Sequence, residues 1–150
     1  MLFLTTVLST LALLSGSVLS AEFQLDSIYS SRRQSNNLHF DIWEDNPLSN
    51  ETARCESSWN VQKLNWPTEY IACGESTSWN WYVTNWTVYN FTLELRHSFS
   101  DPSTQTFHQR FARFVEPHYS TCKYVGQGVT NCNFPSGAAE VYDEKITPLE

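Results

Sequence analysis

Histidine and carboxylate residues in the second half of the chain are its best candidates for acid–base chemistry. Glu116 and His118 stand two positions apart, and His97 and His108 lie upstream. A glutamate and a histidine, together with an arginine, could serve as the acid and base of a small hydrolase or ribonuclease. However, the sequence contains neither a GxSxG nor an HExxH motif. We therefore expect no enzyme activity and name no catalytic residue.

Tryptophan side chains offer a second kind of chemistry, because an exposed indole can stack on a sugar ring. Three of the six tryptophans, Trp59, Trp66 and Trp86, fall near predicted loops. Trp79 and Trp81 alternate within a predicted strand, so we place them in the core. Trp66 and Trp86 are the candidate binding residues, and a secreted carbohydrate-binding module is the main alternative function.

All four cysteines follow the first fifty residues: Cys55, Cys73, Cys122 and Cys132. An even number of cysteines in an exported chain indicates two disulfides, for which three connectivities exist. Pairing nearest neighbours would close two short loops, each worth about 3 kcal/mol of stability by the loop-entropy model. The sequence has no CxxC motif or clustered Cys/His spacing, so we expect neither a metal site nor a cofactor.

Residues 1–20 have the character of a signal peptide. The stretch from Met1 to Ala21 is uncharged and rich in Leu and Val, and Val18 and Ser20 are small enough for the signal-peptidase site. A membrane anchor is the alternative, but the apolar run is short and interrupted at residues 15–17. We expect cleavage after Ser20, which makes the protein secreted and extracellular, with residues 21–150 forming a single domain.

The charge of the chain limits its partners. Nine basic and 16 acidic residues give a net charge of −7, and an acidic surface repels phosphate backbones and anionic membrane faces. We therefore expect no nucleic-acid partner and no membrane association after signal cleavage. Arg32 and Arg33 form a dibasic pair that could be a processing site, but an exposed loop is the favoured interpretation.

The stretch from Tyr70 to His97 predicts a β-hairpin, and the rest of the chain is organised around it. Bulky apolar residues occupy alternate positions in two runs, which is the period of a strand with one buried face. Gly74 directly after Cys73 provides the permissive backbone of a tight turn, and residues 84–88 are the expected connection. The two runs are Trp79, Trp81 and Val83, and Phe91, Leu93 and Leu95.

Further short strands complete the prediction. Residues 38–43 are predicted to form a strand in which Leu38, Phe40 and Ile42 share one face. Residues 23–29 form an imperfect strand with Phe23, Leu25, Ser27 and Tyr29 on one face. Residues 138–146 form the last strand. Phe107, Phe111 and Phe114 instead have the spacing of a helix. Many short strands separated by turns indicate an all-β fold, a small antiparallel barrel or sandwich stapled by two disulfides.

Three N-glycosylation sequons begin at Asn50, Asn85 and Asn90. Two of them fall in or beside the predicted connection at residues 84–88. If they are used, that end of the hairpin must be exposed to solvent. We expect glycans at Asn50 and Asn85 first and at Asn90 last.

Several of these elements together resemble the major-allergen family of the fungus Alternaria, the Alt a 1-like secreted proteins. The resemblance runs from about Phe23 to the last strand. It rests on the run from Asn37 to Ile42, on the lone Cys55, on the sequence Tyr-Ile-Ala-Cys-Gly-Glu at residues 70–75, and on the two late cysteines. No catalytic signature belongs to it.

The resemblance implies an antiparallel barrel-like fold with Cys55–Cys73 and Cys122–Cys132 paired. It also implies a strand over residues 107–115, and we follow it over the helical spacing, because tertiary context outweighs local pattern. Members are secreted effectors and allergens released at the plant interface. The resemblance therefore implies a non-catalytic virulence protein that binds a host defence protein or a small phenolic ligand.

This chain departs from the family at one point. The founding allergen forms a dimer through an additional N-terminal cysteine, and no cysteine precedes Cys55 here. We therefore expect no disulfide-linked dimer, whereas non-covalent self-association stays possible. Any ligand site built at such a dimer interface is in doubt for this chain.

Overall fold

The computed structural model describes residues 21–116 and 120–150, and these residues form only strands and the turns and loops between them. The expected signal peptide lies outside the described residues. The ten strands are β1 (Glu22–Arg32), β2 (Ser35–Glu44), β3 (Ala53–Asn60), β4 (Ile71–Ala72), β5 (Trp79–Thr87), β6 (Asn90–Asp101), β7 (Thr106–Val115), β8 (Thr121–Gly126), β9 (Val129–Asn133) and β10 (Gly137–Pro148).

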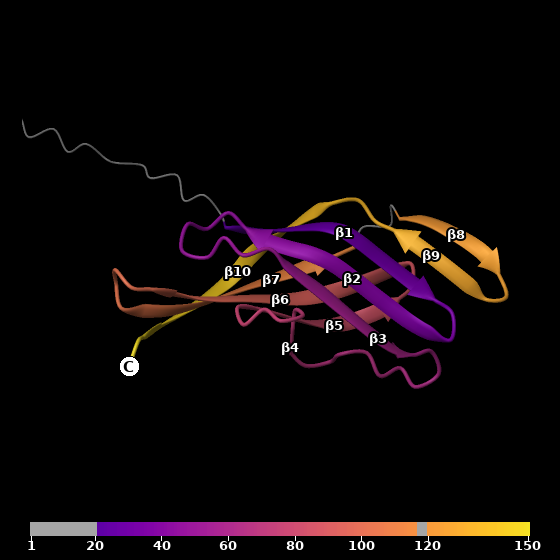
Figure 1. Ribbon diagram of the computed structural model, residues 1–150, viewed down its shortest axis with the longest axis horizontal. Helices are drawn as coiled ribbons and strands as arrows, with labels where there is room; N and C mark the ends of the chain where they lie inside the picture. Colours follow the sequence, from indigo (N-terminus) through magenta and orange to yellow (C-terminus); the bar gives the residue numbers. More distant parts are fainter. Residues whose placement is uncertain (1–20, 117–119) are drawn as a thin grey trace, which may run out of the picture.

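Eight of the strands follow one antiparallel path in the order β3-β2-β1-β10-β7-β6-β5-β4 (Figure 1). The path curls into a nearly closed barrel, so its two end strands, β3 and β4, come together. The disulfide between Cys55 of β3 and Cys73, the residue after β4, joins these ends with a Cα–Cα distance of 4.1 Å. This bond therefore closes the barrel wall where the hydrogen-bonded path stops.

The β8–β9 hairpin extends the wall beside β1. The first half of β1 pairs with β10 over Glu22–Leu25, and its second half pairs with β9 over Tyr29–Arg32. Between the halves the register shifts at Ser27, whose φ is 51°. A bulge of this kind adds a residue to one strand and bends it.

Alternating side chains fill the barrel interior. Trp79 and Trp81 are fully buried and meet Phe23 and Phe40 edge to face, with ring centroids 4.9 and 5.2 Å apart. Leu38, Phe40 and Ile42, and likewise Phe91, Leu93 and Leu95, are all buried, which confirms their predicted shared faces. The barrel thus holds two of its largest side chains at its centre.

Two local predictions are wrong. The bulge at Ser27 reverses the alternation in β1, so Ile28 is buried and Ser27 is exposed. The expected connection at residues 84–88 is shorter, because β5 continues to Thr87 and the turn is Val88 and Tyr89. A single residue of bulge exchanges the two faces of everything that follows it, and period-two counting cannot show where that residue stands.

The helical spacing of the phenylalanines in residues 107–114 is also misleading, because this segment is strand β7, as the resemblance implied. Phe114 is buried in the barrel. Phe111 is half-buried and contacts the Tyr70 ring and the Lys145 ammonium. Residues an odd number of positions apart lie on opposite faces of a strand, so Phe111 and Phe114 do not share a helical stripe.

The two disulfides are Cys55–Cys73 and Cys122–Cys132, as the nearest-neighbour pairing and the resemblance implied. The second bond joins directly opposite residues of the β8–β9 hairpin. All four cysteines of the sequence are used within the chain, which agrees with the expectation of no disulfide-linked dimer. Such bonds are compatible with folding in an oxidising compartment.

Replacing Cys55 and Cys73 together by serine should open the barrel at β3 and β4. We expect the free energy of unfolding to fall by about 3 kcal/mol and cleavage by a broad-specificity protease to become much faster. Urea denaturation and timed digestion measure the two effects.

The control is the pair Cys122→Ser with Cys132→Ser, which removes a bond inside a hairpin that its ladder still holds. This variant should lose protection mainly in residues 121–133. Digestion of the Cys55/Cys73 variant at the wild-type rate would contradict the closing role.

Candidate functional site

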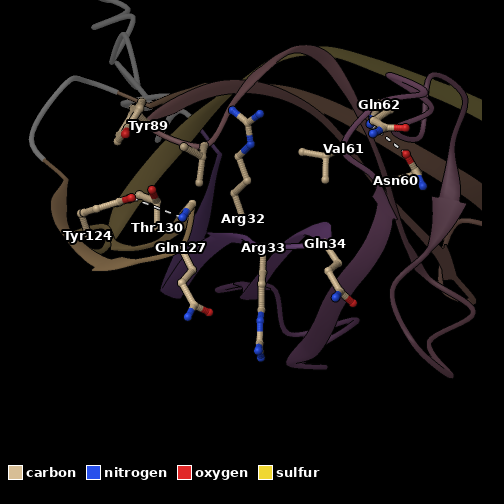
Figure 2. Close-up of a pocket in the computed structure, with 12 residues that line it drawn as sticks. Arg32, Arg33, Gln34, Asn60, Val61, Gln62, Tyr89, Tyr124, Gln127 and Thr130 are labelled. Carbon is tan, nitrogen blue, oxygen red and sulfur yellow. Dashed lines mark hydrogen bonds between the residues drawn. The ribbon is translucent and has the colours of Figure 1, made fainter.

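Four connections meet at one end of the barrel and enclose an open cleft of about 680 Å³ (Figure 2). We call this cleft the mouth; the connections that form it lie at the right-hand end of Figure 1. It is formed by the β1–β2 turn, the start of the loop after β3, the β5–β6 turn and the β8–β9 hairpin. The lining residues are Arg32, Arg33, Gln34, Asn60, Val61, Gln62, Val88, Tyr89, Tyr124, Gln127, Gly128 and Thr130.

Hydrogen bonds hold these connections in place. The buried Ser30 hydroxyl donates to the Val88 carbonyl at 2.5 Å and so ties β1 to the β5–β6 turn. In the β8–β9 turn the Gly128 amide donates to the Tyr124 hydroxyl at 3.3 Å, and Gly126 and Gly128 take the positive φ angles that the turn needs. These hydrogen bonds therefore fix the turns of the mouth to the strands of the barrel.

Cationic and aromatic side chains surround the mouth. Arg32 and Arg33 are both exposed, as expected, but only Arg33 lies in the turn, because Arg32 is the last residue of β1. Their side chains extend in opposite directions (Figure 2). Tyr89 and Tyr124 are 55% and 71% exposed. Exposed rings beside guanidinium groups can stack on a flat ligand and pair with its negative charges.

A smaller hollow adjoins the mouth and shares Arg32, Val61, Val88 and Tyr89 with it. It has a volume of about 370 Å³, and Trp86 is one of its lining residues. Of the two candidate binding tryptophans, Trp86 therefore lies beside the mouth.

The two candidate tryptophans are less exposed than expected. Trp66 and Trp86 are half-buried and pack against the core. Trp86 stacks on Phe91, and Trp59, only 4% exposed, meets its edge at a centroid distance of 4.5 Å. Trp59 is therefore not the exposed indole that its position predicted. A role for Trp66 and Trp86 in binding stays a prediction.

The glycosylation sequons have different surroundings. Asn50 and Asn85 are exposed, whereas Asn90 is half-buried. Asn85 and Asn90 stand on the two strands that flank the Val88–Tyr89 turn, so glycans there would border the mouth. Which sequons carry glycans stays a prediction.

A buried polar network lies elsewhere, between β2 and β6. His97 is fully buried; its Nδ1 lies 2.6 Å from a Glu44 carboxylate oxygen and its Nε2 lies 2.9 Å from the Ser49 hydroxyl. Burial alone would raise the pKa of Glu44, but hydrogen bonds from His97 and Arg110 outweigh it and hold that pKa below its usual value. Arg110 also pairs with Glu144, which His108 contacts at 2.9 Å.

This network differs from the predicted acid–base group. His97 and His108 meet Glu44 and Glu144, neither of which sequence reasoning selected, and His118 lies outside the described residues. A signal was nevertheless present, because Glu44 and His97 continue the buried faces of their strands. A polar residue at a core position needs a buried partner.

The hydrogen-bonded chain of side chains from Ser49 through His97 to Glu44 has the same order of groups as the catalytic triad of a serine hydrolase. Here, however, the His97 ring lies parallel to Trp79 with centroids 4.0 Å apart and has no exposed surface. The Glu44 carboxylate also binds Arg110. We interpret the network as a link that ties the loop after β2 to the far wall of the barrel.

Glu116 is another buried carboxylate, besides Glu44 and Glu94, and it lies near the mouth end. Its backbone amide donates to the Phe91 carbonyl. Its side chain is 2% exposed, and neither carboxylate oxygen has a hydrogen-bond partner among the described residues. Burial raises the pKa of Glu116 to about 7.

Residues 21–116 and 120–150 hold no cluster of three or more His, Cys, Asp or Glu side chains placed for a metal ion. They also contain no helix of the length and apolarity needed to cross a bilayer. Comparison with known proteins gives no match to a family model, a curated protein or a solved structure. The resemblance to the Alternaria allergens therefore stays a prediction.

Replacing Glu44 by glutamine should destabilise the barrel, because Arg110 would lose its buried counter-charge. Breaking a buried ion pair from one side costs about 3–5 kcal/mol, and we expect a loss near the lower figure in urea denaturation. The control is Asp41→Asn on the same strand, which breaks the exposed Asp41–Arg54 pair and should cost less than about 1 kcal/mol. Equal losses in the two variants would contradict the structural role of Glu44.

Glu116 should make the stability of the fold depend on pH. Its pKa is higher in the folded chain than in the unfolded chain, so the folded state binds more protons between pH 4.5 and about 7. Stability therefore falls as the pH rises through this window and levels off above it. Glu116→Gln should remove this decline, and thermal melts of both proteins at pH 5 and pH 8 test it. A decline of the same size in the variant would show that another group causes it.

Proposed function

We propose that this protein is a secreted, non-catalytic binding protein that acts at the surface of a host plant, with the mouth as its binding site. The observation that carries the proposal is that exposed aromatic and cationic side chains from three separate connections gather in one cleft, beside amides from a fourth. A barrel closed by a disulfide holds that cleft, so little ordering is needed when a ligand binds.

Secretion is part of the proposal. Residues 1–20 have the sequence of a signal peptide, and two disulfides stabilise the domain that follows. The same disulfides would help the protein to resist extracellular proteases, because local opening is limited.

The partner follows from the resemblance, which points to a host defence protein or a small phenolic ligand and to a role in virulence or allergy. A second candidate function, carbohydrate binding, is favoured by one observation: Tyr89 and Tyr124 are exposed beside side-chain amides that can bond to hydroxyl groups. A secreted hydrolase is the remaining alternative. It would need the Ser49–His97 pair to become accessible to a substrate.

Affinity capture from plant apoplastic fluid tests the proposal. The oxidised protein is the bait, and the comparison bait is the variant Arg33→Glu with Tyr124→Ser, which changes two exposed residues of the mouth. We expect one host component to bind the wild type and to be lost with the variant. Lys145→Gln, an exposed basic residue of β10 outside the mouth, is the control and should retain that component.

Each other result counts against a stated part of the proposal. A component that the mouth variant also retains would contradict the assignment of the site. Recovery of cell-wall glycan alone would favour the carbohydrate-binding function. Covalent labelling of Ser49 by a fluorophosphonate would contradict the non-catalytic assignment.

A further inference from the structure

The charges of this protein are separated along its length. Residues 27–40, 57–68, 84–93 and 120–139 supply the lining of the mouth, and they contain no aspartate or glutamate. The same segments contain four of the nine basic residues. All 16 acidic residues and the other five basic residues lie outside them. Although the whole chain has a net charge of −7, the segments that form the mouth have a positive net charge.

The basic residues at this end lack the partners that the others have. Arg32 and Arg33 line the mouth. Lys63 lies in the sequence between Gln62, which lines the mouth, and Leu64, which lines the smaller hollow. Lys123 directly precedes Tyr124 in the sequence. None of the four forms an ion pair with a described residue.

The remaining basic residues are all engaged. Arg54, Arg110 and Arg113 pair with carboxylates, Arg96 bonds to the Asn80 amide oxygen and covers the Tyr70 ring, and Lys145 lies over the Phe111 ring. Arg32 and Arg33 at the mouth, together with Lys63 and Lys123 on the neighbouring connections, are thus a separate group that forms no ion pair with a described residue. Such a patch in an otherwise acidic molecule attracts anions and orients them toward one end.

Glu116, a carboxylate near this end, does not cancel the patch. Glu116 is near it through its backbone bond to Phe91, but its side chain is buried. A buried carboxyl without a partner favours its neutral form, so Glu116 adds little negative charge in mildly acidic fluid.

The uncharged lining indicates what kind of anion fits. Gln34, Asn60, Gln62 and Gln127 contribute side-chain amides to the lining, and Gln34 and Gln127 extend on the same side as Arg33 (Figure 2). Amides donate and accept hydrogen bonds, as sugar hydroxyls require, and Tyr89 and Tyr124 supply exposed rings at the same place.

We propose that the mouth binds an acidic polysaccharide, in which successive sugar rings carry carboxylates. The carboxylates pair with Arg32 and Arg33, the hydroxyls bond to the amides, and the ring faces lie against the tyrosines. This inference rests on the proposed function in using the mouth as the binding site, and it names a ligand for the carbohydrate-binding candidate rather than for a host protein or a phenolic compound. It selects a sugar polymer over an acidic protein on the basis of the amide lining.

Binding to three soluble polymers tests the inference on the full, oxidised protein. Polygalacturonate carries both sugar rings and carboxylates, its fully methyl-esterified form keeps the rings without the charge, and polyglutamate keeps the charge without the rings. We expect saturable binding to polygalacturonate, at least about tenfold weaker binding to the other two, and loss of binding as salt is raised, because salt screens exposed charges.

Matched variants locate the site. Arg32→Glu with Arg33→Glu should weaken polygalacturonate binding at least about tenfold, and Tyr124→Ser should weaken it without changing the salt dependence. The control, Arg54→Glu with Lys145→Glu, changes the net charge by the same amount outside the mouth and should bind as the wild type does. Circular dichroism checks that each variant is folded.

Three results would overturn the inference. Equal binding to polyglutamate would identify the site as one for an acidic polypeptide. Equal binding to the methyl-esterified polymer would show that the mouth does not recognise the carboxylate charges of the ligand. No binding to any polymer would also overturn it, but mouth-dependent retention of a host protein would leave the proposed function standing. Failure of both experiments would reject the mouth as a binding site.

Discussion

The bond between Cys55 and Cys73 is the constraint on which the rest of this structure depends. The hydrogen-bonded path begins at β3 and ends at the two-residue strand β4, so the wall would have two open edges without a covalent link. Exposed edges with unpaired backbone groups are sites of opening and aggregation. The disulfide holds these two edges together at Cys55 and Cys73.

The closed frame divides the polar groups between two ends of the molecule. On one side, the Glu44–His97–Ser49 network and the Arg110–Glu144 pair consume their charges within the structure. At the mouth, Arg32 and Arg33 are exposed and form no ion pair with a described residue. Interactions that neutralise each other stabilise a fold, whereas unpaired charges on exposed turns are free to meet a ligand. This contrast, rather than the presence of any one residue, is the reason to look for function at the mouth.

The His97 network also shows why order of groups is weak evidence for catalysis. A serine, a histidine and a glutamate lie in hydrogen-bonded sequence, but the histidine is covered on one face by Trp79 and the glutamate is shared with an arginine. A relay must present its serine and its histidine to the same reacting atom. In this barrel the three side chains form hydrogen bonds with one another and so hold the loop after β2 in place.

The sequence by itself determined the elements whose reason is local. Alternation predicted the buried faces at Leu38–Ile42 and Trp79–Val83, and the spacing of four cysteines made the observed pairing one of three. Only the tertiary structure decided where a bulge reverses β1, why Phe111 and Phe114 lie on opposite faces, and that Glu44 meets His97 across 53 positions. It also decided that four acid-free segments, far apart in the chain, become one positive cleft. Strand periodicity is a property of neighbouring residues, whereas the pairing of distant strands depends on closure of the whole sheet, which no short window of sequence contains.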